Sequence, residues 1–356
     1  MSNTLTIALA SLGGVLLAGV IAHGAWAARK AGPKRADAPA ERIEPREPVM
    51  DGAAAPTGEA SEAAPTLAAL HSPAPERRAS KRVLPKVDAL IDSIATVRVD
   101  APIGGGQVLA HLPTTRRAGG KPFIVEGLNS ETGEWEAPVA SQRYGEFQAG
   151  VQLANRTGAL NEIEYSEFVQ KVQAFADAIG ALADFPDMLE AVAGARELDH
   201  FAVAHDAQLA VHLRAGAVAW SVGYIQQHAA RHGFVPGVVP GRLVMPAAED
   251  GAPPVLTLTF DSQAALADDP NLAAVRDMTL SFDVPQTDSK AAPFAAWQAS
   301  AQALAQSMDA AIVDDQGRTL GTESFASIGN ELGQLYAALE ARDLAAGTPA
   351  ARRLFS

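Results

Sequence analysis

The sequence predicts an α+β protein with three parts: a membrane-spanning helix, a linker and a folded head in which strands and helices alternate. Three observations support this prediction. Residues 5–27 are apolar and uncharged, and residues 28–88 are rich in alanine, proline, glutamate and arginine and contain no aromatic side chain. From residue 89 onward, strand and helix periodicities follow one another. The folded head is therefore expected to begin near residue 89.

Residues 5–27 predict a single transmembrane helix through the lipid bilayer. At 1.5 Å per residue, a helix of this length covers about 30 Å of hydrocarbon. A cleaved signal peptide is the alternative, because Ala25 and Ala27 resemble a cleavage site, but residues 1–4 lack the positive charge that such a peptide needs. Four positive residues instead follow the segment between residues 29 and 35. The positive-inside rule therefore predicts that residues 1–4 are periplasmic and that the head is cytoplasmic.

Residues 28–88 predict a disordered linker. Their composition offers too little apolar surface to offset the entropy of ordering the chain. A flexible coil of about 60 residues has an end-to-end distance of roughly 40–50 Å. We therefore expect the head to be tethered to the membrane with considerable reach.

A first module is predicted at residues 89–205. Apolar alternation predicts strands at 94–99, 121–125 and 144–153. Helices are expected at 104–111, 161–181 and 187–201. The buried side of the second helix should carry the apolar residues that recur at helical spacing, namely Ile163, Phe168, Val172, Phe175 and Ile179.

A second module is predicted at residues 206–346, followed by a frayed tail that begins near Arg342 and includes residues 347–356. Strands are expected at 209–213, 255–260, 278–284 and 311–313, and helices at 218–232, 294–308 and 322–340, the last capped by Thr322. The order of elements resembles that of the first module. An internal duplication is one interpretation and two unrelated modules is the other, because the sequence identity between the halves is low.

The charge and the residue types exclude several classes of function. The formal net charge is −13, which argues against an electrostatic grip on nucleic acid. Cysteine is absent, so disulfides, thiolate zinc sites and cysteine nucleophiles are excluded together. We therefore expect the partner of the head to be another protein, with no cofactor.

The last third of the chain carries a family resemblance. A strand that ends in proline at 278–285 (MTLSFDVP) precedes an alanine-rich helix with Trp297 and Leu304, and the strand and turn at 311–318 (AIVDDQGR) follow. This succession resembles the end of the FtsZ-binding domain of the ZipA family, whose members also place an N-out membrane helix and a proline-rich linker before that domain. The resemblance covers residues 206–346, and residues 89–205 lie outside it.

The resemblance implies a function and a site. It implies an antiparallel sheet covered by helices on one face, with the C-terminal tail of FtsZ bound on the open face. It also implies a non-enzymatic tether at the bacterial inner membrane, located at the division site. The main alternative is a membrane-anchored structural or regulatory protein that binds a different envelope or division partner.

Strand alternation predicts which residues of the second module face the partner. It buries the leucines and phenylalanines and turns Gln208, Asp283 and several small polar residues outward. The loop after the helix at 218–232 is expected to add apolar anchoring surface. The predicted partner-binding residues are Ala210, Phe234, Val235, Val238, Val239, Thr257, Thr259 and Ser281.

Several motifs permit chemistry but have simpler interpretations. His228 and His232 are spaced to share a metal ion, but zinc needs further ligands that nothing nearby supplies, so a solvated helix face is the preferred interpretation. The two aspartates at 314–315 could bind magnesium, but they are better interpreted as the end of a strand followed by a turn. Glycines 104–106 are interpreted as the entry to a helix, because they lack a phosphate-binding signature. Trp135 and Trp220 are either core residues or exposed peptide-binding aromatics. We expect no enzyme and no metal, with a membrane-attached hydrolase as the minor alternative.

Overall fold

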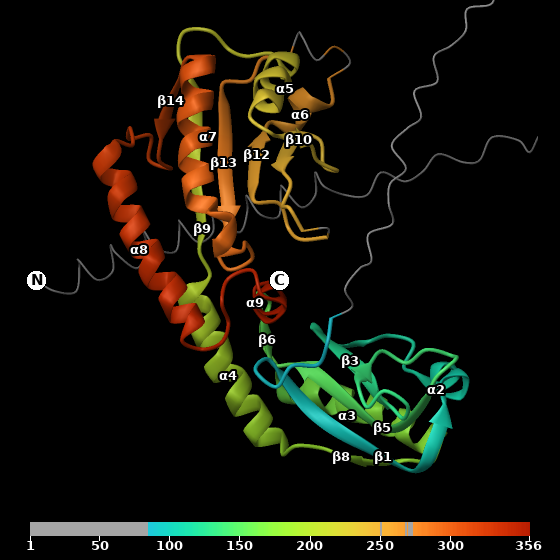
Figure 1. The fold of residues 1–356 in the computed structure, drawn as a ribbon. Coiled ribbons are helices and arrows are strands. Elements are labelled where there is room, and N and C mark those ends of the chain that lie inside the picture. Colours follow the sequence, from blue (N-terminus) through green and yellow to red (C-terminus); the bar gives the residue numbers. More distant parts are fainter. Residues whose placement is uncertain (1–84, 250, 268, 270–272) are drawn as a thin grey trace, which may run out of the picture. The chain divides into compact units, whose positions relative to one another are not determined.

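The structure is a computed structural model that describes residues 85–249, 251–267, 269 and 273–356. The predicted membrane helix at 5–27 and the predicted linker up to residue 84 lie outside the described residues. Within the described part, no helix is long and apolar enough to cross a membrane. These residues form an α+β fold with two six-stranded antiparallel sheets and one short two-stranded sheet (Figure 1). The predicted α+β class with antiparallel strands is therefore confirmed.

The first sheet has the strand order β2-β3-β5-β1-β8, and β4 pairs with β3. Its strands are β1 (Asp92–Gly104), β2 (Arg117–Ala118), β3 (Lys121–Asn129), β4 (Trp135–Glu136), β5 (Arg143–Gln152) and β8 (Leu182–Asp184). A separate hairpin consists of β6 (Ala154–Asn155) and β7 (Gly158–Ala159). The helices of this module are α2 (Gly105–His111), α3 (Glu162–Ile179) and α4 (Met188–His205).

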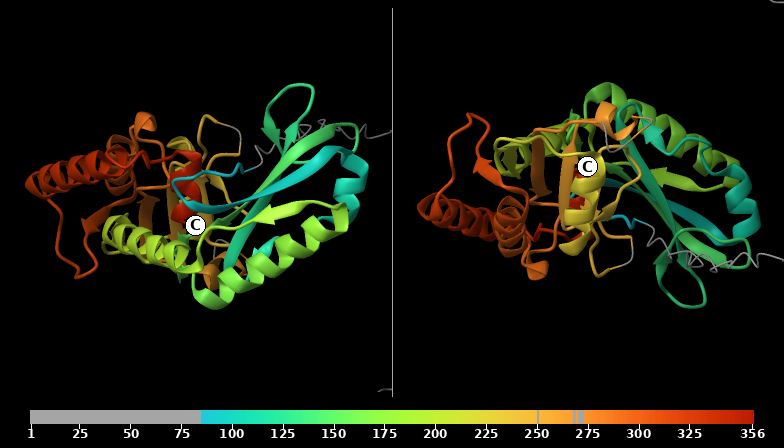
Figure 2. Two further views of the ribbon diagram at one scale, coloured as in Figure 1. Left: turned by 90° about the horizontal axis from the view of Figure 1, so that it is seen from below. Right: turned by 90° about the horizontal axis from the view of Figure 1, so that it is seen from above.

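Helix α3 covers one face of the first sheet (Figure 2). Phe123 meets Phe168 edge-on with ring centroids 5.6 Å apart, and Phe147 meets Phe175 in the same way at 5.8 Å. The prediction that Ile163 belongs to this buried face is wrong, because its side chain is 82% exposed. Asn161 caps the helix in a capping box, which places residue 163 in the first turn, on the solvent side.

The second sheet has the order β10-β11-β12-β13-β9-β14. Its strands are β9 (Gln208–Ala215), β10 (Val235–Pro236), β11 (Arg242–Met245), β12 (Leu256–Phe260), β13 (Asp277–Asp283) and β14 (Ala310–Val313). Its helices are α5 (Val222–Arg231), α6 (Ser262–Ala265), the 3-10 turn η1 (Ser289–Ala291), α7 (Pro293–Met308), α8 (Thr322–Glu340) and α9 (Pro349–Leu354).

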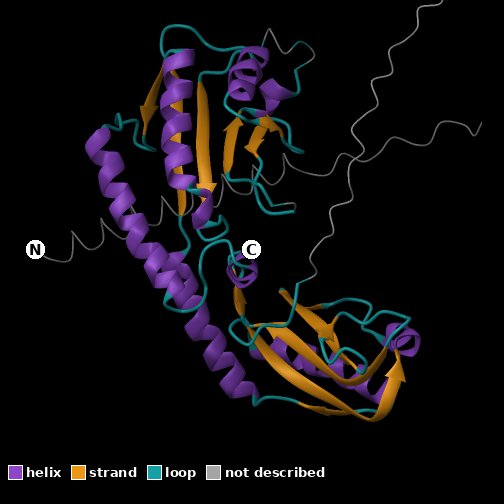
Figure 3. Ribbon diagram, in the orientation of Figure 1, coloured by secondary structure: helices purple, strands orange, loops and turns teal. Residues whose placement is uncertain are grey.

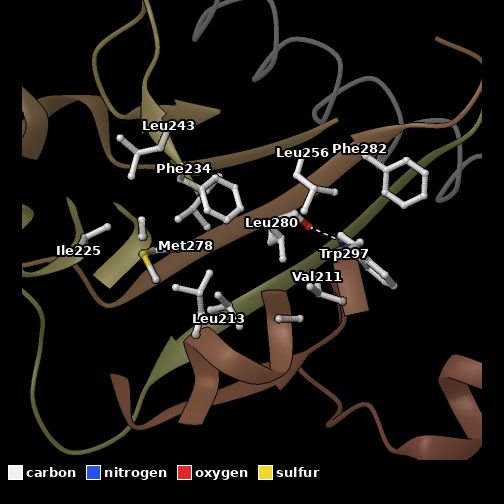
Figure 4. Close-up of a cluster of buried hydrophobic side chains, with 14 of the residues drawn as sticks. Val211, Leu213, Ile225, Phe234, Leu243, Leu256, Met278, Leu280, Phe282 and Trp297 are labelled. Carbon is white, nitrogen blue, oxygen red and sulfur yellow. Dashed lines mark hydrogen bonds between the residues drawn. The ribbon is translucent and has the colours of Figure 1, made fainter. Parts of the chain in front are cut away.

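Helices α5 and α7 contribute to one core on one face of the second sheet (Figure 3). Alternate residues of β9, β12 and β13 point into this core, as the sequence predicts. Trp297 is a buried member of this core and donates a hydrogen bond from Nε1 to the carbonyl oxygen of Leu280 at 2.9 Å (Figure 4). Trp220 is also a core residue, since it is buried and donates to the carbonyl oxygen of Met308 at 2.8 Å. Trp135 is half-buried on β4.

The two sheets share one topology. The neighbours in the first sheet run β3-β5-β1-β8, and in the second they run β12-β13-β9-β14, with every pair antiparallel. In chain order, each module has one helix between the first and the second of these four strands and another helix directly before the fourth. This is the split βαβ arrangement of the βαββαβ motif. The topology therefore favours the duplication over two unrelated modules.

The C-terminal residues correct the sequence prediction. The expectation that the chain frays beyond Arg342 is wrong, because α9 follows and Phe355 is only 1% exposed. Gln152 on β5 donates to the carbonyl oxygen of Arg353 at 2.7 Å, and Arg353 forms an ion pair with Asp92 on β1 at 2.5 Å. The end of the chain is thus fastened to the first sheet. The prediction that Thr322 caps α8 is wrong, because Gly321 is the N-cap and Thr322 is the first residue of the helix.

Candidate protein-binding face

The face of the second sheet opposite α5 and α7 presents two rows of side chains that cross the strands. Each row takes one residue from β11, β12, β13 and β9 in register. The rows are Arg242, Thr259, Thr279 and His212, and beside them Val244, Thr257, Ser281 and Ala210. Because most of these side chains are small, the face is shallow and carries many hydroxyl groups.

A groove of about 380 Å³ lies over these rows. Its lining consists of Gln208, Ala210, Arg242, Thr257, Thr259, Thr279 and Ser281. A hydroxyl group both donates and accepts hydrogen bonds, and a side-chain amide does the same. The groove is therefore suited to hydrogen-bonding an extended peptide rather than to enclosing a large apolar side chain. We call the surface formed by these seven residues the open groove.

The open groove contains half of the predicted binding residues. The structure brings together Ala210, Thr257, Thr259 and Ser281 on its floor. Val235, Val238 and Val239 are exposed on β10 and on the turn that leads to β11. The prediction that Phe234 contacts a partner is wrong, because that residue is 3% exposed and belongs to the core under the sheet.

Three residues of the open groove were not among the predicted binding residues: Gln208, which was predicted only to face outward, and Arg242 and Thr279. Arg242 lies on β11, a strand that the sequence analysis did not predict at all. Thr279 lies on a predicted strand, two residues before Ser281. The sequence pattern predicts that Thr279 faces outward with Ser281, because residues two apart on a strand share a face.

An ion-pair network closes one end of the face. Nδ1 of His212 lies 2.8 Å from Oδ1 of Asp277, and Nε2 lies 3.1 Å from Oδ1 of Asp315. Arg214 adds a contact from Nε to Asp277 at 3.3 Å. The hydrogen bond to Asp277 is the main cause that raises the pKa of His212 above its usual value, and Asp315 adds to it. The carboxylates at this end therefore already have positively charged or protonatable partners.

Arg156 pairs the carboxylates at the other end. It approaches Asp206 at 2.6 Å and Asp283 at 2.7 Å. Burial raises the pKa of Asp283, and the hydrogen bond from Arg156 opposes that effect. Asp283 faces outward, as predicted, but its charge is satisfied within the chain.

The corresponding face of the first sheet is covered by the chain itself. The backbone N–H of Val87 donates to Oε1 of Glu126 at 3.3 Å, and a Cβ added to Gly150 would lie only 2.8 Å from Cγ1 of Val87. Glu126 is 2% exposed and also accepts a hydrogen bond from Gln148. Arg353 occupies the neighbouring position over Asp92. Residues 86–88 and the C-terminus thus take up space over the first sheet, whereas no described segment lies over the open groove of the second sheet.

The other motifs do not converge on a site. His228 stacks on Tyr224 with ring centroids 4.2 Å apart, and burial lowers its pKa. Asp314 accepts hydrogen bonds from the N–H groups of Gln316 and Arg318, which is the turn that the sequence predicts. Among the described residues, no group of three or more His, Cys, Asp or Glu side chains is arranged to hold a metal ion.

Comparison with known proteins finds that no family model matches the chain and that no curated protein matches it either.

Proposed function

We propose that this chain is a ZipA-like tether of the bacterial divisome. The helix at 5–27 anchors it in the inner membrane with residues 1–4 in the periplasm, and residues 28–88 set its reach. The cytoplasmic head binds the C-terminal tail of FtsZ and holds filaments at the membrane at the division site. Binding and tethering need no chemical step.

One observation carries the proposal: among the described residues, no segment lies over the hollowed face of the second sheet, whereas residues 86–88 and Arg353 cover part of the same face of the first sheet. The open groove crosses four strands of the second sheet, the module that resembles the ZipA family. We therefore assign FtsZ binding to the second module, with the exposed valines of β10 and its turn as the apolar contact.

The test blocks each face in turn in the full-length chain, kept in detergent micelles. Thr259→Arg puts a long side chain into the open groove, and Thr96→Arg puts the same side chain on the corresponding face of the first sheet. A labelled peptide of the last residues of FtsZ from the same organism is titrated with each protein, and anisotropy gives the dissociation constant. We expect Thr259→Arg to weaken binding by about tenfold or more, which corresponds to about 1.4 kcal/mol.

The matched variant decides the interpretation. Thr96→Arg should bind as tightly as the parent chain, and circular dichroism should show both variants folded. Equal losses in both variants would contradict the assignment to the second sheet. No binding of the parent chain to the peptide or to full-length FtsZ would contradict the proposed function.

The polar floor of the open groove favours one alternative, a membrane-anchored structural or regulatory protein with a different envelope or division partner. Its hydroxyl groups favour binding of a partner that presents many hydrogen-bonding groups. Imaging separates the two functions: a tether of FtsZ loses its mid-cell position when FtsZ is depleted, whereas a protein held by another partner keeps it.

A further inference from the structure

Arg242 is the cation of the open groove. It lies on β11, where it is exposed, and its Nη2 approaches Oγ1 of Thr257 at 3.4 Å. Among the described residues, no carboxylate oxygen comes within 4.0 Å of its guanidinium. Its charge is thus free to meet a group from outside the chain.

The neighbouring carboxylates are already paired, which makes Arg242 distinctive on this face. Asp277 and Asp315 contact His212, and Asp283 contacts Arg156. The paired Asp277 and Asp283 lie at the two ends of β13, and Arg242 lies on β11, two strands away. A partner therefore meets satisfied charges at the ends of the face and one unsatisfied positive charge inside the groove.

Hydroxyl donors surround this charge. Thr259 is directly opposite Arg242 in the register of β11 and β12, and Thr257 lies within 3.4 Å of the guanidinium. Adjacent strands are about 4.8 Å apart, so one carboxylate can reach the guanidinium and a threonine hydroxyl together. The planar fork of arginine matches the two oxygens of a carboxylate better than the point charge of lysine does.

Apolar surface lies immediately beside this charge. The N–H of Arg242 donates to the carbonyl oxygen of Val239 at 3.1 Å, and the N–H of Gly237 donates to the carbonyl oxygen of Arg242 at 2.8 Å. These bonds hold the turn against the backbone of Arg242, and Val238 and Val239 are exposed on that turn. A segment with an acidic residue beside an apolar one matches both features.

We propose that Arg242 binds an acidic side chain of the partner peptide, and that the valines of the β10–β11 turn contact the apolar residue next to it. The inference rests on the proposed function, since it names the residue of the FtsZ-binding groove that binds the negative charge of the peptide. It assigns the specificity of the groove to one arginine on a strand that the family resemblance does not single out.

The test is a double-mutant cycle with the full-length chain in detergent micelles. Each acidic residue of the FtsZ tail peptide is replaced, one at a time, by the corresponding amide, and one further peptide is amidated at its C-terminus. Each peptide is titrated with the parent chain, with Arg242→Gln and with Arg242→Lys. Arg231→Gln is the control, because it removes one positive charge from α5, on the helix-covered side of the same sheet.

We expect Arg242→Gln to weaken binding of the unmodified peptide about threefold to tenfold, because an exposed charged pair contributes no more than an ordinary hydrogen bond. With the parent chain, one of the amide peptides should bind more weakly than the unmodified peptide by the same factor. With Arg242→Gln, that amide peptide should bind as tightly as the unmodified peptide does. Arg242→Lys should fall between, and Arg231→Gln should match the parent chain.

Three outcomes would overturn the inference. If every amide peptide and Arg242→Gln lose affinity independently, Arg242 has no carboxylate partner, although FtsZ binding stands. A loss confined to a peptide amidated at its C-terminus would assign the charge to the terminal carboxylate instead of a side chain. If the parent chain binds no form of the peptide, the proposed function falls together with the inference.

Discussion

Replacing Arg353 by methionine is expected to lower the free energy of unfolding by about 3 kcal/mol, because it leaves a buried carboxylate without its cation. The Asp92 side chain is fully buried and that of Arg353 is 14% exposed. Two hydrogen bonds join them, at 2.5 and 2.8 Å. Breaking a buried pair from one side costs about 3–5 kcal/mol. The lower end applies here, because the N–H of Asp88 still donates to Asp92 at 2.8 Å.

The pH dependence of this loss follows from the pKa of Asp92. Burial raises that pKa above its usual value, and Arg353 opposes the rise. Without Arg353 the folded-state pKa rises further, whereas the unfolded-state value stays near 3.9. A carboxyl with a raised folded-state pKa favours folding at low pH, and that contribution is lost as the pH rises through the folded-state pKa. The Arg353→Met penalty should therefore shrink as the pH falls through the pKa of the unpaired Asp92.

Urea unfolding of the full-length chain, followed by far-ultraviolet circular dichroism at about pH 8 and about pH 4.5, measures both effects. The double variant Asp92→Asn with Arg353→Met should regain part of the lost stability, since it buries no charge. A loss below about 1 kcal/mol at the higher pH, or one that grows toward acid, would refute the role given to this ion pair.

Two further predictions concern the second sheet. His212 has a raised folded-state pKa, so its pairs with Asp277 and Asp315 stabilise the fold fully below its unfolded value near 6.5 and less as the pH rises through the folded value. The melting temperature of the parent chain should therefore exceed that of His212→Gln more at about pH 5.5 than at about pH 8.5, and an equal difference at both would contradict the pairing. Leu280→Ala should cost about 2–5 kcal/mol in urea unfolding, because the residue is fully buried against Trp297. Thr279→Ala, one residue away on the open face, should cost less than about 1 kcal/mol, and similar losses would show that the two faces were assigned wrongly.

The strands of both sheets were predictable where the alternation was long enough to read. β12 and β13 alternate between core leucines or phenylalanines and outward threonine or serine, which predicts both the strand and its faces. β11 was missed because it has only four residues, Arg242–Met245, and it follows a glycine-rich turn. The residue that matters most for the inferred specificity therefore lay on the element with the weakest sequence signal.

Other errors arose because burial depends on distant parts of the chain. Helix α9 has no apolar periodicity of its own, and its burial comes from residues of the first module such as Ile91 and Ala154. Phe234 follows a helix end and reads as a loop residue, yet it fills the core beneath β11. No local pattern distinguishes such a residue from an exposed anchor, because both are apolar residues in a turn.

The different use of two equivalent sheet faces suggests what the first module contributes. Its covered face holds residues 86–88, the last three residues of the predicted linker, and it also holds the C-terminus. A pull on the linker would therefore act on the first sheet rather than on the open groove of the second. On the proposed function, this separation keeps the load on the linker away from the binding site. Several heads anchored in one membrane would then contact one filament together, and linked sites bind at a high effective concentration.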